Sequence, residues 1–269
     1  MSGVKAMISK FATLLIEKEG GIMTVTFNRL THRNSITPGF LEELNEALRQ
    51  AEQDNTCKIV ILQGQSGVFC TGMDFDGVVT REAGEETRSQ QPGDLPSHSY
   101  MQILRRLSLI PRVIVALVDG QVMAGGVGLA AASDLVIATP RSQFSLSEAL
   151  WGLMPSMVIP YLIRRVGFQK AYRMTLTTMP ISGAEARDYG LVDELTENPQ
   201  EAIRQLQQRL LKLETSTVGN IKSYFRKMWL VTEELENMAA AETARLLADP
   251  VVFENIINFV KYKKFPWEK

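Results

Sequence analysis

The sequence predicts an α/β fold followed by a helical C-terminal region. Over the first two thirds, short apolar runs typical of buried strands alternate with amphipathic helical patterns. From Ser182 onward nearly every segment has helical spacing instead. The chain has 269 residues, of which 45% are hydrophobic and 22% charged, which is enough for a large core. We therefore expect one large domain, or one domain with a helical appendage.

Turn and capping residues delimit the first elements. Residues 12–28 contain two apolar runs around Glu19-Gly20-Gly21 and predict a hairpin. Thr37 and Pro38 predict a helix start, with the N-cap residue followed by proline in the first turn. One face of that helix is apolar: Phe40, Leu41, Leu44, Ala47, Leu48 and Ala51. Residues 57–65 predict a short buried strand, and residues 68–77 a strand leading into a loop.

The remaining elements follow in order. Residues 77–97 carry charges, glycine and proline with little apolar periodicity, and predict a long surface loop. A helix (100–110), two strands (112–120 and 134–140) and two helices (159–167 and 169–178) are expected next. Beyond Ser182 the pattern predicts helices over 182–190 and 198–213, the latter with Asn198 and Pro199 as cap and first turn, and then three further helical segments.

Charge and composition exclude several classes of function. The formal net charge of −1 favours neither nucleic acid nor an anionic membrane surface. No apolar run is long enough for a signal peptide or a membrane span, so a cytoplasmic location is expected. Cys57 and Cys70 lie in strand-like contexts and are expected to be reduced core residues. With only two histidines, a His/Cys metal site is not expected.

The stretch "QVMAGGVGLAAASDL", residues 121–135, concentrates small residues after an apolar strand. Small residues let a helix pack closely on a sheet, but a helical glycine costs about 1 kcal/mol relative to alanine. Gly125 and Gly126 in a first turn would expose N–H groups at the positive end of the helix, where an oxyanion can bind. A second donor is then expected, and the Met73 N–H, after Thr71-Gly72, is the candidate.

A dinucleotide site is the rival interpretation of this stretch. The residues from Gly126 to Ala131 satisfy G-x-G-x-x-A, and an acidic residue, Glu148, follows. In that motif, however, the first glycine closes the strand directly, and the acid ends the next strand. Here "DGQVMA" intervenes and the next strand ends in Ala138-Thr139, so the interpretation is rejected.

Three segments in order, "VFCTGMDF", "VIVALVDGQVMAGGVGLAAASDLVIA" and "FSLSEALWGLMP", resemble the crotonase (enoyl-CoA hydratase/isomerase) superfamily, and the resemblance runs from Phe11 to the C-terminus. It implies an enzyme with the ClpP/crotonase fold, a spiral of ββα units, in a core domain (1–195) and a helical trimerisation region (196–269). It implies a homotrimer or hexamer acting on acyl thioesters of CoA or of an acyl carrier protein. Carried over, the family's two oxyanion N–H groups fall on Met73 and Gly125.

Hydratases of this family use two glutamates. This sequence keeps the second as Glu148 and has Gly128 in place of the first. Apolar neighbours should raise the pKa of Glu148 toward a value suited to proton transfer, although a surface helix glutamate is the plainer interpretation. A double-bond isomerase or a dehydratase needs only one carboxylate.

A finer resemblance favours the dehydratase. The combination "AGGVG…SLSEALWGLMP…IPYLIRRVGFQKAYRMTLTTMPIS" with the terminal "FPWE" resembles the β-branching dehydratases of polyketide assembly lines. It implies a 3-hydroxy-3-methylglutaryl-type thioester on an acyl carrier protein and a companion crotonase decarboxylase, with no cofactor beyond the carrier's phosphopantetheine or CoA. The alternatives are a 3,2-enoyl-CoA isomerase, a generic enoyl-CoA hydratase and a catalytically inactive binding subunit.

Other residues are candidates for substrate binding. Gly72, Asp74 and Gly126 adjoin the two oxyanion donors. A glutaryl-type substrate has a free carboxylate, for which the candidate partners are Arg81, Arg88, His98, Arg105 and Arg106, although each also suits a solvated surface. An acidic carrier would dock on a basic rim, for which the candidates are Arg164, Arg165 and Lys170, or Lys261, Lys263 and Lys264. The alternative is that these cations cover helix ends. Asn34 is interpreted as turn chemistry.

Overall fold

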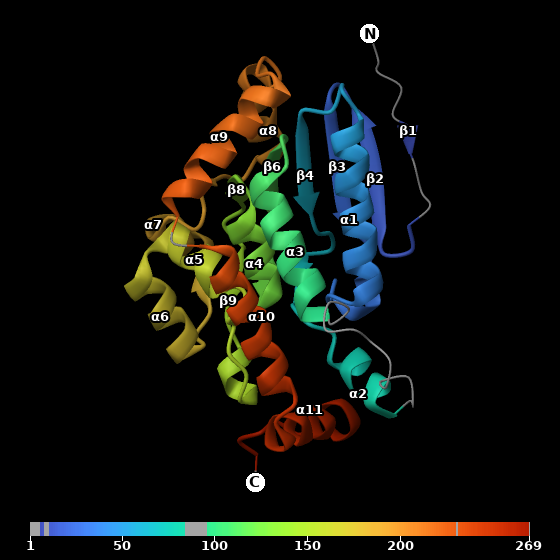
Figure 1. The fold of residues 1–269 in the computed structure, drawn as a ribbon, viewed down its shortest axis with the longest axis vertical. Helices are drawn as coiled ribbons and strands as arrows, with labels where there is room; N and C mark the ends of the chain where they lie inside the picture. Colours follow the sequence, from blue (N-terminus) through green and yellow to red (C-terminus); the bar gives the residue numbers. More distant parts are fainter. Residues whose placement is uncertain (1–5, 8–10, 84–95, 230, 269) are drawn as a thin grey trace.

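The computed structural model describes residues 6–7, 11–83, 96–229 and 231–268, which form two sheets surrounded by helices (Figure 1). In this part of the chain the larger sheet has the order β1 (Ala6–Met7), β2 (Leu14–Glu19), β3 (Ile22–Phe27), β4 (Ile59–Gln63), β6 (Val113–Val118), β8 (Leu135–Ala138) and β11 (Glu194–Leu195). The smaller sheet has the order β10 (Ile181–Ser182), β9 (Gln143–Ser145), β7 (Gln121–Met123) and β5 (Val68–Cys70).

The N-terminal hairpin is confirmed. β2 and β3 pair antiparallel from Leu14 opposite Phe27 to Glu19 opposite Ile22. The turn uses Gly20 and Gly21, both with positive φ, a conformation that costs glycine little. From β3 onward, β4, β6, β8 and β11 pair in parallel, as strands joined by helical crossovers do.

Alternation along the central strands divides the large sheet into two buried faces. On β4 and β6 the side chains of Val60, Leu62, Ile114 and Ala116 point into the main core, whereas those of Ile59, Ile61, Val113 and Val115 point into a second cluster. The main core is completed by α1 (Pro38–Gln53), α3 (Pro96–Leu109) and α4 (Gly125–Ala132). The second cluster is covered by α8 (Pro199–Leu210) and α9 (Thr215–Met228). Covered on both faces, these strands are continuously apolar.

The two predicted helix starts are also confirmed. The Thr37 side chain accepts a hydrogen bond from the Phe40 N–H, and the six residues expected to form the apolar face of α1 are its buried residues. At α8 the Asn198 side chain accepts from the Glu201 N–H, and Pro199 occupies the first turn. Capping side chains satisfy N–H groups that a helix cannot bond internally.

The expected loop over residues 77–97 is wrong at both ends. Helix α2 covers Phe75–Ala83, and α3 already begins at Pro96. The carboxylate of Asp74 accepts a hydrogen bond from the Gly77 N–H and so caps α2. Phe75 and Val79, one turn apart, pack in an apolar cluster with α11 (Pro250–Tyr262). This packing stabilises a helix whose own sequence has little periodicity. Residues 84–95 lie outside the described part of the chain.

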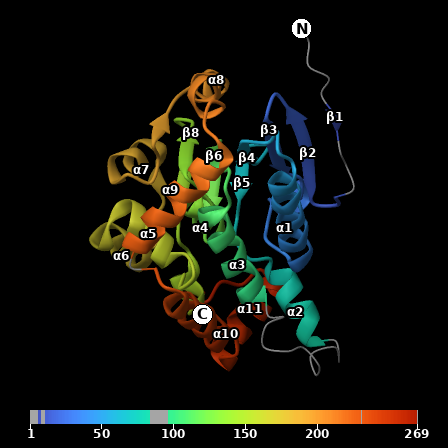
Figure 2. The same ribbon diagram turned by 45° about the horizontal axis from the view of Figure 1, so that its top comes forward.

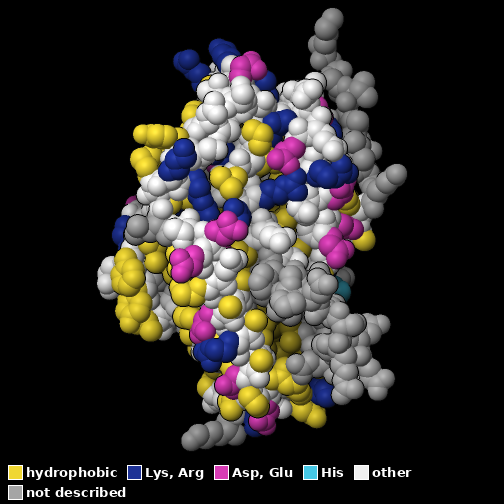
Figure 3. Space-filling model, in the orientation of Figure 1, with side chains coloured by type: hydrophobic (Ala, Val, Ile, Leu, Met, Phe, Trp, Pro, Cys, Tyr) yellow, Lys and Arg dark blue, Asp and Glu magenta, His cyan; other side chains and the backbone are white. Residues whose placement is uncertain are grey.

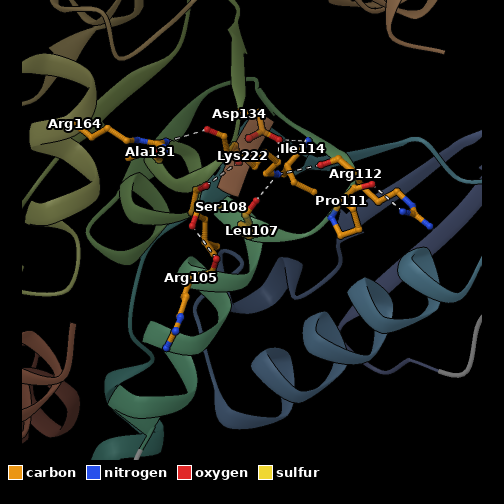
Figure 4. Close-up of polar contacts among 12 residues, drawn as sticks. Arg105, Leu107, Ser108, Pro111, Arg112, Ile114, Ala131, Asp134, Arg164 and Lys222 are labelled. Carbon is orange, nitrogen blue, oxygen red and sulfur yellow. Dashed lines mark hydrogen bonds and ion pairs between the residues drawn. The ribbon is translucent and has the colours of Figure 1, made fainter. Parts of the chain in front are cut away.

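The chain after Leu195 consists of helices α8 to α11 joined by short connections, and these helices pack on the core. α10 (Glu233–Leu247) contributes Ala239 and Ala240 to the main core. α9 is held by Lys222, whose buried ammonium donates to the carbonyls of Leu107 and Arg112 and pairs with Asp134 at 2.7 Å (Figure 4). One cation thus joins α9 to the end of α3 and to the starts of β6 and β8.

Between β9 and β11 in the sequence come α5 (Ile159–Val166), α6 (Phe168–Thr177) and α7 (Gly183–Tyr189), in agreement with the helical spacing. α2, α10 and α11 gather at one end of the molecule in both views (Figures 1 and 2). Cys57 and Cys70 are free and buried, as expected. Among the described helices, none has both the length and the apolar character needed to cross a membrane.

Candidate active site

Three adjacent parallel strands end at the site. In the small sheet, β7 lies between β5 and β9 and pairs in parallel with both. The segments that follow these strands are Thr71-Gly72-Met73, Ala124-Gly125-Gly126 and the segment leading to Glu148. Carboxyl ends of neighbouring parallel strands meet at one edge of a sheet, where ligands bind in α/β proteins. The topology therefore brings together the three motifs that the sequence singled out.

The Met73 N–H is free to bind a ligand. Ile36 donates its N–H to Gly72 O and accepts from the Asp74 N–H, so it bonds the residues on either side of Met73. In such a parallel bridge the N–H of the central residue points to the opposite side. Within the described residues this N–H has no hydrogen-bond acceptor.

The Gly125 N–H lies beside it. Gly72 has φ +83°, and a Cβ atom added there would lie 3.2 Å from Gly125 N and 2.6 Å from the Ala124 Cβ. Gly125 begins α4, so its N–H has no partner inside the helix, and no other described residue accepts from it. The strand-end turn and the helix start thus bring two N–H groups without acceptors close together, which suits the binding of an oxyanion.

Gly126 allows α4 to pack closely against β5. A Cβ atom at this position would lie 2.5 Å from the carbonyl oxygen of Cys70, on β5. Only glycine allows α4 to approach β5 this closely, which keeps the Gly125 N–H at the end of that strand. Gly126 therefore contributes to the site through packing.

Glu148 starts the short 3-10 helix η4 (Glu148–Trp151). Glu148 as a whole is partly exposed, but its side-chain Oε2 is buried and has no hydrogen-bond partner among the described residues. Burial raises the pKa of the Glu148 carboxyl from 4.5 to about 7, against the opposing effect of backbone N–H groups at Glu148 and Ser147. A carboxyl group with this pKa can accept and return a proton near neutral pH.

The Asp74 carboxylate is engaged within the protein. Besides capping α2, it accepts hydrogen bonds from the Arg29 guanidinium at 2.7 Å and the Ser35 hydroxyl at 2.9 Å. Although burial opposes the charged form, these donors hold the pKa of Asp74 below its ordinary value. The network fixes the segment that carries the Met73 N–H. Asp74, a candidate for substrate binding, has its carboxylate bonded to these donors within the protein.

Tyr100, on α3, lies at the site although the sequence analysis assigned it no role. Its hydroxyl donates to Gly125 O at 2.5 Å. A Cβ atom added at Gly128 would lie only 2.1 Å from the same hydroxyl oxygen. Burial, together with the Cys70 thiol and the Glu148 carboxyl, raises the pKa of Tyr100 well above its usual value. A neutral hydroxyl thus lies against the first turns of α4, at Gly125 and Gly128.

The profile of the enoyl-CoA hydratase/isomerase family matches residues 17–269. The chain belongs to this family. A relative in Bacillus subtilis (strain 168), bacillaene synthase dehydratase PksH, is 32% identical over 96% of this chain and 97% of its own length. The 1,2-epoxyphenylacetyl-CoA isomerase of Escherichia coli (strain K12) is 28% identical over 78% of this chain and 80% of its own.

Solved structures of family members have the same fold. The crystal structure of a putative polyketide biosynthesis enoyl-CoA hydratase (pksH) from Bacillus subtilis has a TM-score of 0.88 at 32% identity and covers 96% of this chain and 100% of its own. An enoyl-CoA hydratase/isomerase from Marinobacter aquaeolei has a TM-score of 0.73 at 26% identity, covering 96% and 99%. The crotonase superfamily, its fold and an enzymatic function, all expected from the sequence, are thereby confirmed.

The structure describes the side chains of only some of the candidate partners for a substrate carboxylate. Arg81 lies in α2 and His98 in α3, but their side chains, like all of Arg88, fall outside the described part. Arg105 and Arg106 pair with protein carboxylates, on Glu233 and Glu52 respectively. As turn chemistry predicts, Asn34 bonds backbone groups, the Arg29 N–H and Val68 O.

Two candidates for the basic rim, Arg164 and Arg165, are engaged within the protein. Arg164 and Arg165 donate to backbone carbonyls of Ala131 and Ser133 at the C-terminal end of α4, as Figure 4 shows for Arg164 and Ala131. Arg165 also pairs with Asp193, and its side chain is only 8% exposed. These cations cover the end of a helix, the alternative that the sequence had left open. In contrast, Lys261, Lys263 and Lys264 are exposed.

Proposed function

We propose that the chain is a dehydratase that removes water from a 3-hydroxy-3-methylglutaryl-type (3-carboxymethyl-3-hydroxyacyl) thioester carried on an acyl carrier protein. The observation that carries the proposal is the buried, unbonded Oε2 of Glu148, which follows the sheet edge where the Met73 and Gly125 N–H groups are free. At position 128 the Tyr100 hydroxyl leaves no room for a second carboxylate. The relative PksH, matched over nearly its full length, is described as a dehydratase and supports a hydro-lyase.

The reaction needs one proton carrier and one oxyanion site. The thioester oxygen accepts hydrogen bonds from the Met73 and Gly125 N–H groups, which acidifies the protons on C2. Ionised Glu148 takes a C2 proton and the enolate forms. The C3–O bond then breaks, and the departing oxygen recovers the same proton from Glu148 and leaves as water. Loss from a tertiary carbon is assisted by the enolate.

The carrier protein, the companion decarboxylase and the homotrimer are parts of this proposal. Lys261, Lys263 and Lys264 are exposed around the end of α11, which packs on η4 beside Glu148, and an acidic carrier would dock there. Hydrophobic side chains gather over α6 (Figure 3), where Phe168, Tyr172 and Leu176 are exposed. An apolar surface of this kind is suited to an interface with a second copy.

The test is the intact mass of a carrier protein loaded with 3-hydroxy-3-methylglutaryl phosphopantetheine. Incubation with the wild-type enzyme should remove one water, whereas Glu148→Gln should leave the mass unchanged. No change with the wild type would reject the dehydratase. A 3-enoyl-CoA, assayed in parallel, would then reveal the isomerase, for which one carboxylate also suffices.

A further inference from the structure

The hydroxyl of Tyr100 occupies the place where hydratases of this family would begin a glutamate side chain. The distance of 2.1 Å from a Gly128 Cβ to this oxygen leaves no space for any side chain at position 128. The ring cannot move aside cheaply, because Tyr100 is 5% exposed and packed in the main core. The Tyr100 hydroxyl on α3 therefore occupies the space beside Gly128, where α4 carries no side chain.

The hydrogen bond that this hydroxyl already makes determines whether it can donate to a ligand or accept from one. Its one hydrogen is donated to Gly125 O at 2.5 Å. A phenolic oxygen has one donor and also acceptor capacity, so what remains is the acceptor. Among the described residues no donor reaches it. The Glu148 carboxyl lies near enough to act on it electrostatically.

We infer that Tyr100 is a substrate-positioning residue whose hydroxyl oxygen accepts a hydrogen bond from the 3-hydroxyl of the substrate. This rests on the proposed dehydration. With its hydrogen directed to Tyr100, the 3-hydroxyl presents a lone pair to Glu148, the group that must protonate it. Tyr100 keeps its own proton throughout, while the C2 proton passes to Glu148 and leaves in the water.

A neutral acceptor suits this substrate better than a carboxylate. A second carboxylate at this point would repel ionised Glu148 and raise its pKa above 7. It would also face the free carboxylate of a glutaryl-type substrate. The tyrosine supplies the lone pair without the charge.

The test compares two reactions in wild type and Tyr100→Phe. The first is dehydration of the 3-hydroxy-3-methylglutaryl carrier protein. The second is exchange of C2 protons with deuterium oxide in the 3-methylglutaryl carrier protein, which has no 3-hydroxyl and needs only Glu148 and the oxyanion N–H groups. Tyr100→Phe should lower kcat for dehydration by about 10- to 100-fold, the range for a buried hydroxyl that loses its partner, and leave exchange within about twofold.

An equal loss in both reactions would reduce Tyr100 to a structural role and overturn the inference, as would unchanged dehydration. If wild type exchanges protons but does not dehydrate, the proposed function fails and the inference fails with it. Gln102→Ala, on the exposed side of α3, serves as the control and should affect neither reaction.

Discussion

Glu148 combines a buried oxygen with the absence of any side-chain partner. In the described residues, the other buried side-chain atoms without a hydrogen-bond partner belong to Arg226 and Glu236, which bond each other through their remaining atoms at 2.5 Å. Glu236 Oε2 also lies 3.9 Å from the Arg105 guanidinium. An unpaired buried carboxyl destabilises the folded state when ionised. Its place after the sheet edge that carries the free Met73 and Gly125 N–H groups indicates that function, not stability, accounts for it.

Replacing this carboxyl should stabilise the protein at alkaline pH. Because the pKa of Glu148 is raised from 4.5 to about 7 on folding, its contribution to stability is full below pH 4.5 and is lost as pH rises through 7. Glu148→Gln should thus raise the free energy of unfolding by up to about 3 kcal/mol at pH 8 and leave it nearly unchanged at pH 4.

Thermal denaturation of both proteins at the two pH values measures this difference. Glu254→Gln, at an exposed position on α11, is the matched control and should show no such pH-dependent gain. A wild-type protein that is the more stable one at pH 8 would mean that the carboxylate is well solvated or paired.

The contact between Gly128 and Tyr100 can be tested without substrate. Gly128→Ala should destabilise the fold by about 1–3 kcal/mol, because its Cβ would overlap the Tyr100 hydroxyl oxygen. In Tyr100→Phe that oxygen is absent, and the added methyl should cost less. A double-mutant cycle by urea denaturation checks the coupling, and additive costs would show that the two groups do not compete for one space.

At the scale of elements, the site depends on the connection between a strand end and a helix start. Gly72 has φ +83° and faces α4, so alanine there would be strained and would contact Ala124 and Gly125. Gly72→Ala should lower kcat by about 100-fold or more by displacing an oxyanion donor. Gly77→Ala, in α2 where a Cβ meets nothing within 4 Å, should leave turnover unchanged. Equal effects in steady-state assays would show that the turn is not specifically required.

Local chemistry explains which elements were predictable from sequence. The hairpin at Gly20-Gly21 and the helix begun by Thr37-Pro38 carry their own turn, cap and periodicity, so both were predicted. Helix α2 was missed because it depends on the Asp74 cap and on packing against α11, which is distant in the sequence. The position of Tyr100 at the site was not predicted for the same reason, because no spacing in the sequence indicates that α3 packs over Gly128.

At the scale of the whole molecule, the helical region is joined to the sheet by the buried ammonium of Lys222, which pairs with the partly buried Asp134. Lys222→Met would leave the carboxylate of Asp134 and two carbonyls without this donor, at a cost of about 3 kcal/mol or more. Lys227→Met, on the exposed side of the same helix, should cost little. Urea denaturation of the two variants compares them, and similar losses would mean that Lys222 does not hold α9.

The three strand ends that form the site were visible as motifs, but their meeting at one edge required the fold. The resemblance placed Met73, Gly125 and Glu148, and the topology of β5, β7 and β9 accounts for their proximity. The position of the carboxyl oxygen and the bonds of Asp74 and Tyr100 depend on packing between elements, which no local pattern records.

In the proposed dehydration, one carboxyl group both takes the proton from C2 and returns it to the leaving oxygen. The most direct measurement is the pH dependence of kcat/KM for dehydration of the carrier-bound substrate between pH 5 and 9. With Glu148 as base and then acid, the free enzyme has one essential ionisation, so kcat/KM should rise with pH through about 7 and then stay level. A bell-shaped profile, with a second group that must remain protonated, would contradict the account.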